Sequence, residues 1–230
     1  MADVEGAVRK AVVDVLALEE HEVTLESALM DDLGAESIDL LDILFRVEQS
    51  TGEKVEGSLH ANEVMALLTV QNVIDLVKGQ AGGARRRSDP RQTPRNLRIG
   101  VDVVGVARLE RVVGDDERRQ ASLFTPGELA YCRGKRRCYE HMAARFAAKE
   151  AVLKAFGTGV SQDMRWTDVE VVNESSGRPR IELDGAVAVF AREHGLKDLD
   201  VSLTHTEGLA LAHAVSVWDE PEKATPAALR

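Results

Sequence analysis

The chain has 230 residues, of which 44% are hydrophobic, and it carries a formal net charge of −10. That length suits one large domain or two small ones, and the apolar content is sufficient for ordinary cores. No apolar run approaches the roughly 20 residues of a membrane span, and the first residues lack the pattern of a signal peptide, so we expect a soluble cytoplasmic protein. Cys132 and Cys138 fit no common zinc spacing and are expected to be free thiols.

The charge is distributed unevenly along the chain. Residues 1–80 carry 17 acidic and 5 basic side chains, residues 81–98 carry one acidic and six basic, and residues 99–230 carry 21 acidic and 18 basic. Three of the basic residues form an Arg-Arg-Arg run at 85–87. This run has acidic neighbours and no aromatic residues beside it, so we predict no nucleic-acid binding.

The stretch between the acidic and the balanced parts is rich in Gly, Pro, Arg and polar residues and has no periodicity. Such a composition is typical of a solvated linker. We therefore predict an acidic domain at 1–80, a flexible basic linker at 81–96, a second domain at 97–218 and a disordered tail at 219–230.

The first domain has the pattern of a small helical bundle. Residues 4–18 place apolar side chains at helical spacing, which predicts an amphipathic helix. A polar loop follows, and then a second helix that begins near Ser37. A short segment at 62–68 and a helix at 70–77 complete a predicted bundle of four helices.

Ser37 has the clearest functional interpretation in this domain. By itself, a Ser before an apolar helix is an N-cap. However, the sequence around it, DDLGAESIDLLDILFRVEQ, resembles the acyl carrier proteins, whose phosphopantetheine serine begins the second helix after a D/E-x-L-G turn. The resemblance covers essentially residues 1–79 and implies that Ser37 carries the arm. The commoner triplet is Asp-Ser-Leu, so Glu36 and Ile38 bear on partner preference.

Glu36, Asp39 and Asp42 form an acidic stripe along the predicted second helix. Solvated carboxylates need no further explanation, but in carrier proteins this stripe is what synthases and transferases recognise. In the second domain, Arg108 and Arg111 lie three residues apart on a predicted helix. We expect Arg108 to face Asp39, and the complementary charges to speed and orient docking.

The second domain mixes strands and helices. Residues 97–103 form an apolar, β-branched run typical of a buried strand, and Asp102 lies near its end. A carboxylate in such a run is costly unless it is paired or binds a metal. Thr125 and Glu128 form a capping box at the start of a helix. The remaining predicted elements are strands at 168–173 and 180–183, a helix at 185–194, and a hairpin of 200–206 with 209–217.

A long helix is predicted from 141 to 156, where there is no Gly or Pro, with Gly157 as its C-cap. Helical spacing places Glu150 and Lys154 on one face, about 40° apart. By itself this is an exposed ion pair that adds a few tenths of a kcal/mol. Arg145 and Lys149 point roughly the other way.

Three segments in the second domain together resemble a known family. They are IGVDVVGVARLERV at 99–112, RFAAKEAVLKAFGTG at 145–159 and VSLTHTEGLALAHAVSV at 201–217. In this order they resemble the holo-acyl-carrier-protein synthases, the small 4'-phosphopantetheinyl transferases. The resemblance implies that Asp102 and Glu150 hold Mg²⁺ on the pyrophosphate of coenzyme A. It also implies that Lys154 lies beside the phosphates.

Further positions follow from the same resemblance. His205, in the context S-x-T-H, matches a histidine near the coenzyme A phosphates, which suggests a phosphate or acid/base role rather than an ordinary polar residue. Arg145 matches a residue of the coenzyme A site. Gly157, Thr158 and Gly159 offer backbone amides without side-chain obstruction, as a phosphate cradle requires.

The sequence thus predicts an all-α four-helix carrier bundle followed by an α+β transferase. The predicted reaction moves 4'-phosphopantetheine from coenzyme A to Ser37, with Glu150 as base directly or through a water. Transferases of this short type are trimers with sites between subunits, so we expect a homotrimer that also meets acyl-chain synthases of fatty-acid or polyketide-type biosynthesis. Two alternatives stay open: an inactive transferase half, or one that serves only separate carriers.

Overall fold

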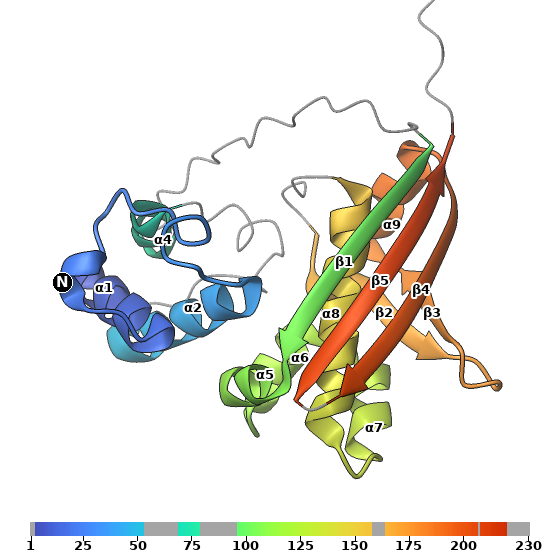
Figure 1. The fold of residues 1–230 in the computed structure, drawn as a ribbon, viewed down its shortest axis with the longest axis horizontal. Coiled ribbons are helices and arrows are strands. Elements are labelled where there is room, and N and C mark those ends of the chain that lie inside the picture. Colours follow the sequence, from blue (N-terminus) through green and yellow to red (C-terminus); the bar gives the residue numbers. More distant parts are fainter. Residues whose placement is uncertain (1–2, 53–68, 79–95, 158–163, 207, 220–230) are drawn as a thin grey trace, which may run out of the picture.

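The computed structural model describes residues 3–52, 69–78, 96–157, 164–206 and 208–219 (Figure 1). The predicted third helical segment at 62–68, nearly all of the predicted linker and nearly all of the tail lie outside these residues. The described parts form a helical first half and a mixed second half. This arrangement confirms the predicted fold class.

In its described residues, 3–52 and 69–78, the first half contains the α-helices α1, α2 and α4 (Figure 1). Helix α1 packs against α2 and α4, and the side chains between them, such as Val8, Leu40 and Val73, are fully buried. The bounds of the elements are α1 Val4–Leu16, the 3-10 turn η1 Glu20–Glu22, α2 Ser37–Thr51 and α4 Val70–Val77.

Ser37 is the first residue of α2 and not its cap. The N-cap is Glu36, whose backbone is extended and whose N–H donates to the Asp39 carboxylate at 2.8 Å. Asp39 thus stabilises the helix start from within its first turn. The N-cap role that an isolated Ser would take is therefore wrong here, and the Ser37 backbone lies inside the first turn of the helix.

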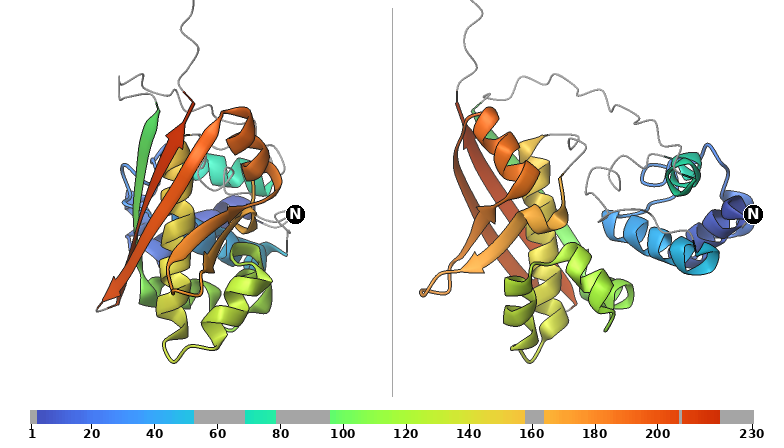
Figure 2. Two further views of the ribbon diagram at one scale, coloured as in Figure 1. Left: turned by 90° about the vertical axis from the view of Figure 1, so that its right-hand side faces the viewer. Right: turned by 180° about the vertical axis from the view of Figure 1, so that it is seen from behind.

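The second half is a three-stranded antiparallel sheet, order β1-β5-β4, with α8 packed across one face (Figure 1, Figure 2). The strands are β1 Leu97–Gly105, β4 Leu196–Thr206 and β5 Leu209–Trp218, with a separate hairpin of β2 Val169–Asn173 and β3 Pro179–Leu183. The helices are α5 Val106–Val113, α6 Glu117–Leu123, α7 Pro126–Arg133, α8 Cys138–Phe156 and α9 Gly185–Glu193.

Helix α8 lies unusually close to β1. Ala147, Ala151 and Ala155, spaced four residues apart on α8, are fully buried. Opposite them, a Cβ placed on Gly100 would lie 1.9 Å from the carbonyl oxygen of Ala151. Small side chains on both elements therefore allow the backbones to approach, and this close contact fixes α8 against the strand that carries Asp102.

The outer face of the sheet is apolar and exposed, which corrects the prediction of a buried strand at 97–103. The alternate side chains of β1 point away from α8 and are between 43% and 59% exposed. Two positions of β5 continue this apolar face. The exposed residues are Leu97, Ile99, Val101, Val103, Leu209 and Leu211.

No helix in the described part of the chain is long and apolar enough to cross a membrane.

Candidate active site and docking surface

The predicted carboxylate pair and lysine come together between β1 and α8. Lys154 Nζ lies 2.6 Å from Asp102 Oδ1 and 3.9 Å from Glu150 Oε2. The Glu150 side chain is 3% exposed, whereas that of Lys154 is 40% exposed. Asp102 points inward because it pairs in the sheet with Ala212, which is fully buried. The site therefore has a buried acidic floor and an accessible ammonium group.

The pKa values of these groups reflect burial and mutual interaction. Burial raises the pKa of the Asp102 carboxyl, although a hydrogen bond and the charge of Lys154, with a hydrogen bond to Glu150, oppose the rise. For Lys154, burial lowers the pKa, but the hydrogen bond and charge of Asp102 and the charges of Glu150 and Glu36 outweigh it. Lys154 thus remains protonated beside two carboxyl groups.

The donor atoms of this site suit Mg²⁺. The carboxyl groups of Asp102 and Glu150 provide the hard oxygen ligands that this ion prefers. In proteins, Mg²⁺ is usually held by one or two carboxylates together with substrate phosphates and waters. Within the described ranges no group of three or more His, Cys, Asp or Glu side chains forms a complete metal site. The pair fits an ion whose other ligands come from a phosphate substrate.

Two basic residues of α8 lie on the side away from this pair. Lys149 is fully buried, pairs with Glu128 at 2.7 Å and donates to the carbonyl oxygens of Trp166 and Val169. Arg145 is 3% exposed, donates to Asn173 Oδ1 at 2.5 Å and lies over the ring of Tyr131.

Within one chain, Arg145 is therefore not beside Glu150. The contact of Arg145 with coenzyme A that the resemblance implies stays a prediction.

His205 also lies apart from the carboxylate pair. Its Nδ1 is 3.0 Å from Glu140 Oε2, and its ring centre is 5.3 Å from that of His141. Burial, followed by the charge of His205, lowers the pKa of His141. Since Glu140 precedes Glu150 by ten residues, the two positions are about 15 Å apart along α8.

The predicted phosphate cradle gains little from Gly157. This residue caps α8 with a φ of 65°, and its N–H donates to the Lys154 carbonyl oxygen. The amide is therefore already used in the helix cap. Thr158 and Gly159 lie outside the described residues.

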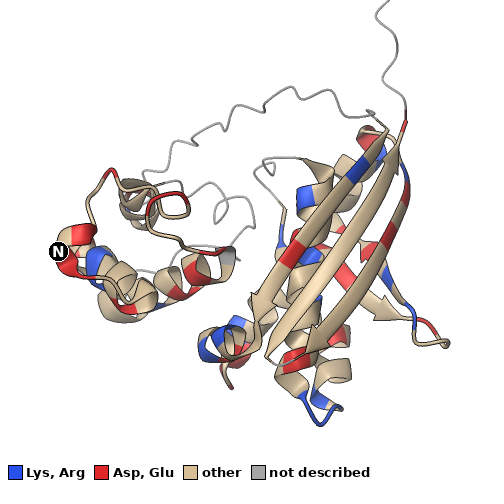
Figure 3. Ribbon diagram, in the orientation of Figure 1, with Lys and Arg blue, Asp and Glu red and all other residues tan. Residues whose placement is uncertain are grey.

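Helix α2 contacts helix α5. Figure 3 shows acidic residues along α2 and basic residues on α5. Arg108 Nη1 lies 2.6 Å from Glu36 Oε2, and its Nε lies 2.7 Å from Asp39 Oδ1. The contact of Arg108 with Asp39 that we expected is thus present. Burial raises the pKa of Asp39, while the hydrogen bond from Glu36 and the charge of Arg108 oppose the rise.

The other predicted docking residues are less directly engaged. Asp42 pairs with Arg46 of its own helix at 3.1 Å. Arg111 lines, with Asp42, a cavity of about 300 Å³ between the two halves. Hence Glu36 and Asp39 carry the direct contact to α5.

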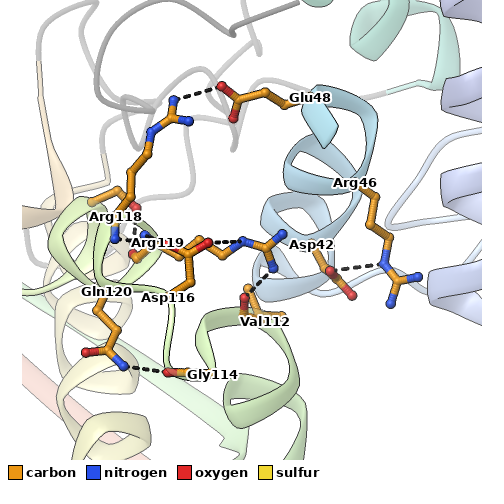
Figure 4. A network of polar contacts seen from close by, with 10 residues as sticks. Asp42, Arg46, Glu48, Val112, Gly114, Asp116, Arg118, Arg119 and Gln120 are labelled. Carbon is orange, nitrogen blue, oxygen red and sulfur yellow. Dashed lines mark hydrogen bonds and ion pairs between the residues drawn. The ribbon is translucent and has the colours of Figure 1, made fainter. Parts of the chain in front are cut away.

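The structure adds a second contact, at α6, that sequence reasoning missed (Figure 4). Arg118 Nη2 lies 2.7 Å from Glu48 Oε1, and the guanidinium of Arg119 lies 4.7 Å from the centre of the Phe45 ring. The one signal available in the sequence was the adjacent Arg pair at 118–119. Its partners could not be identified before the two halves were placed together.

Comparison with known proteins agrees with both halves. Residues 98–212 match the model of the 4'-phosphopantetheinyl transferase superfamily, and residues 6–77 match that of the phosphopantetheine attachment site. A holo-[acyl-carrier-protein] synthase of Moorella thermoacetica is 43% identical over 119 residues, which are 52% of this chain and 92% of that protein. A holo-[acyl-carrier-protein] synthase of Desulforudis audaxviator is 46% identical over 125 residues, which are 53% of this chain and 92% of that protein.

Among solved structures, holo-acyl-carrier-protein synthases overlap the same part of the chain. The synthase of Neisseria meningitidis is 28% identical with a TM-score of 0.48, and covers 52% of this chain and 96% of that one. A synthase of Chronobacterium ammoniagenes in complex with CoA is 25% identical with a TM-score of 0.47, and covers 54% and 98%.

The chain belongs to the 4'-phosphopantetheinyl transferase superfamily. In it, a transferase domain of the holo-acyl-carrier-protein synthase type follows a carrier domain with a phosphopantetheine attachment site. The resemblance seen in the sequence is thereby confirmed for both halves.

Proposed function

We propose that the transferase half primes the carrier half of the same protein, moving 4'-phosphopantetheine from coenzyme A to Ser37. The observation that carries this proposal is the fork made by Arg108, which binds Glu36 and Asp39 on either side of Ser37 in the sequence. In addition, the charge of Glu36 is felt by Lys154. The Arg108 contacts hold the first turn of α2 against α5, the helix that directly follows the strand of Asp102.

The chemistry follows from the groups that the site presents. The Ser37 oxygen forms a bond to the β-phosphorus of coenzyme A, and the bond from this phosphorus to the bridging oxygen breaks. Adenosine 3',5'-bisphosphate leaves. The hydroxyl proton passes to Glu150, directly or through a water, and Lys154 stabilises the negative charge that develops on the phosphoryl oxygens.

Asp102 and Glu150 would hold Mg²⁺ in this reaction. The side chains of the site, two carboxyl groups against one ammonium, leave room for a further cation. When bound, the ion neutralises charge on the pyrophosphate. The ammonium group of Lys154 already pairs with the Asp102 carboxylate. For Asp102 to bind the ion, this ammonium group would turn toward the substrate phosphates.

We further propose a homotrimer with active sites between subunits. The support is the exposed apolar face of β1 and β5, because contiguous patches of this kind mark association surfaces. In such an assembly, the predicted coenzyme A ligands Arg145 and His205, which lie apart from the carboxylate pair of their own chain, would meet the carboxylate pair of a neighbouring subunit. The acidic stripe of α2 would later meet acyl-chain synthases of fatty-acid or polyketide-type biosynthesis, in the cytoplasm.

Intact-protein mass spectrometry tests the proposal. The purified apo protein is incubated with coenzyme A and Mg²⁺, beside the Ser37→Ala and Glu150→Ala variants. We expect the wild type to gain one phosphopantetheine arm and both variants to gain none. A wild type that gains no arm, although an added, known transferase modifies it, would show that the fused transferase half is inactive or serves separate carriers.

A further inference from the structure

The carrier half touches the transferase half at two separate places. The Arg108 fork holds the start of α2, beside Ser37. The second contact involves Phe45 and Glu48, which lie eight and eleven residues after Ser37 and thus more than two helical turns away. A single fork would leave α2 free to pivot, whereas two contacts fix its direction along the transferase.

Arg119 is held in position by its own half of the protein. Its Nη1 donates to the Val112 carbonyl oxygen at 2.8 Å, and its Nε lies 3.4 Å from Asp116 Oδ2. The guanidinium is therefore oriented before the carrier arrives, which reduces the entropy lost on docking. It lies over the face of Phe45, itself 7% exposed.

A partly desolvated cation over an aromatic face is attracted more strongly than one in water. Glu48 adds an ion pair with Arg118, whose side chain is 69% exposed, so this pair serves orientation more than affinity. Phe45 is thus the anchor of the second contact. A carrier with an aliphatic side chain at this position would lack it.

The fused carrier also covers the surface that any other carrier would use. Arg108, Arg118 and Arg119 all face α2 of the same chain. Because the two halves are covalently joined, the fused carrier meets this surface at a high effective concentration. A separate carrier protein must displace it.

We propose that α6 is a second carrier-docking element, which reads Phe45 and Glu48 and so gives the fused carrier precedence over separate carrier proteins. This inference rests on the proposed transferase function. In this proposal Arg119 contributes to the choice of carrier. Helix α2 of the fused carrier competes with separate carrier proteins for the docking surface of the transferase half.

The test changes only the carrier half and reads the modification of a separate carrier. In a Ser37→Ala background, an apo acyl carrier protein is added below saturation with coenzyme A and Mg²⁺, and its modification is followed by mass. We expect Phe45→Leu to raise this rate about two- to fivefold, the amount that losing one cation–π contact implies. Glu48→Gln should raise it less. Since the transferase surface is unchanged, weaker competition is the expected cause of a rise.

Two matched variants serve as controls. Phe45→Tyr keeps an aromatic ring over Arg119, and Glu5→Gln removes an exposed carboxylate from α1, away from the contact. Glu5→Gln should leave the rate unchanged, and Phe45→Tyr should raise it less than Phe45→Leu does. A rate that is unchanged or lower in Phe45→Leu and Glu48→Gln would overturn the proposal.

A second measurement does not depend on activity. Amide hydrogen exchange in α5 and α6 should be faster in Phe45→Leu and Glu48→Gln than in the parent, and unaltered in Glu5→Gln. If the wild type fails to modify itself, the proposed function fails, and the exchange data alone decide whether α6 holds the carrier. If it modifies itself but no variant ever modifies the added carrier, precedence by docking is wrong.

Discussion

Asp102 is a carboxyl group whose charge state controls the candidate active site. Because burial raises its pKa, it takes up a proton at a higher pH than an ordinary aspartate does. A protonated carboxyl binds Mg²⁺ poorly, and metal binding then has to displace that proton. The site should therefore lose affinity for the ion as the pH falls through this raised pKa.

We predict that the Mg²⁺ concentration for half-maximal transfer rises as the pH is lowered from neutral. The measurement is the initial rate of Ser37 modification against Mg²⁺ at a series of pH values, with thermal unfolding checked at each. Arg178→Gln, which breaks an exposed pair with Asp200 far from the site, is the control and should follow the wild type. A Mg²⁺ requirement that stays constant down to the pH at which the protein unfolds would contradict the role of Asp102.

Part of the candidate active site could be predicted from the sequence, residue by residue, for identifiable reasons. Helical spacing places Glu150 and Lys154 together, whereas the strand pattern places Asp102 only near the end of a strand. Its position beside the other two was expected from the resemblance to the synthases. The sequence did not predict the pair of Lys149 with Glu128, because it joins residues 21 positions apart. Glu128 was expected only in a capping box, which it also forms with the Thr125 backbone N–H at 2.9 Å.

The approach of α8 to β1 is the feature between elements on which the site depends most. A methyl group on Gly100 would lie 1.9 Å from the Ala151 oxygen and 2.6 Å from the Ala155 nitrogen, and both are backbone atoms. Neither atom can move without shifting the helix. The same shift would separate Lys154 from Asp102.

We predict that Gly100→Ala destabilises the protein by about 1–3 kcal/mol, the usual cost of overpacking, and slows transfer as well. Gly134→Ala is the matched control, since that residue has a φ of −75° and its Cβ would have no neighbour nearer than 3.5 Å. Urea unfolding followed by circular dichroism measures both variants. Equal stabilities of the two variants would show that α8 can retreat without cost.

Most elements were predicted within a few residues, and the exceptions have physical causes. Helix α6 was not predicted because seven residues carry too little periodicity. It is stabilised by its N-cap Asp116 and by tertiary contacts such as the hydrogen bond from Arg133 Nη2 to Gln120 Oε1 at 2.9 Å. Strand β4 begins earlier than expected, at Leu196, because Gly195 takes a positive φ and turns the chain there.

For the whole molecule, the exposed apolar outer face of the sheet is the feature that supports the proposed homotrimer. The apolar run at the start of the second domain predicted a strand covered on both faces, and one chain covers a single face. The discrepancy is resolved if another subunit covers the rest. The sequence contains this information as hydrophobicity, but it does not say which molecule provides the cover.

We predict that Ile99→Asp, at the most exposed of these positions, converts the proposed homotrimer to monomers and removes most of the transfer activity, because a buried charge without a partner is costly. Val189→Asp is the control, since Val189 is 40% exposed on α9 and lies outside the sheet. Analytical ultracentrifugation distinguishes the species. A wild type that sediments as a monomer would contradict both the trimer and the shared sites.

The contact between the two halves leaves considerable space within it. Cavities of about 300 and 240 Å³ lie between α2 and the helices α5 and α6. Since a water molecule takes about 30 Å³ in the liquid, each cavity has room for several. The halves therefore meet at a few charged and aromatic points rather than over a closely packed surface. Few contacts have to break for the carrier to depart, so a short residence time is expected, as a carrier that must deliver its cargo elsewhere requires.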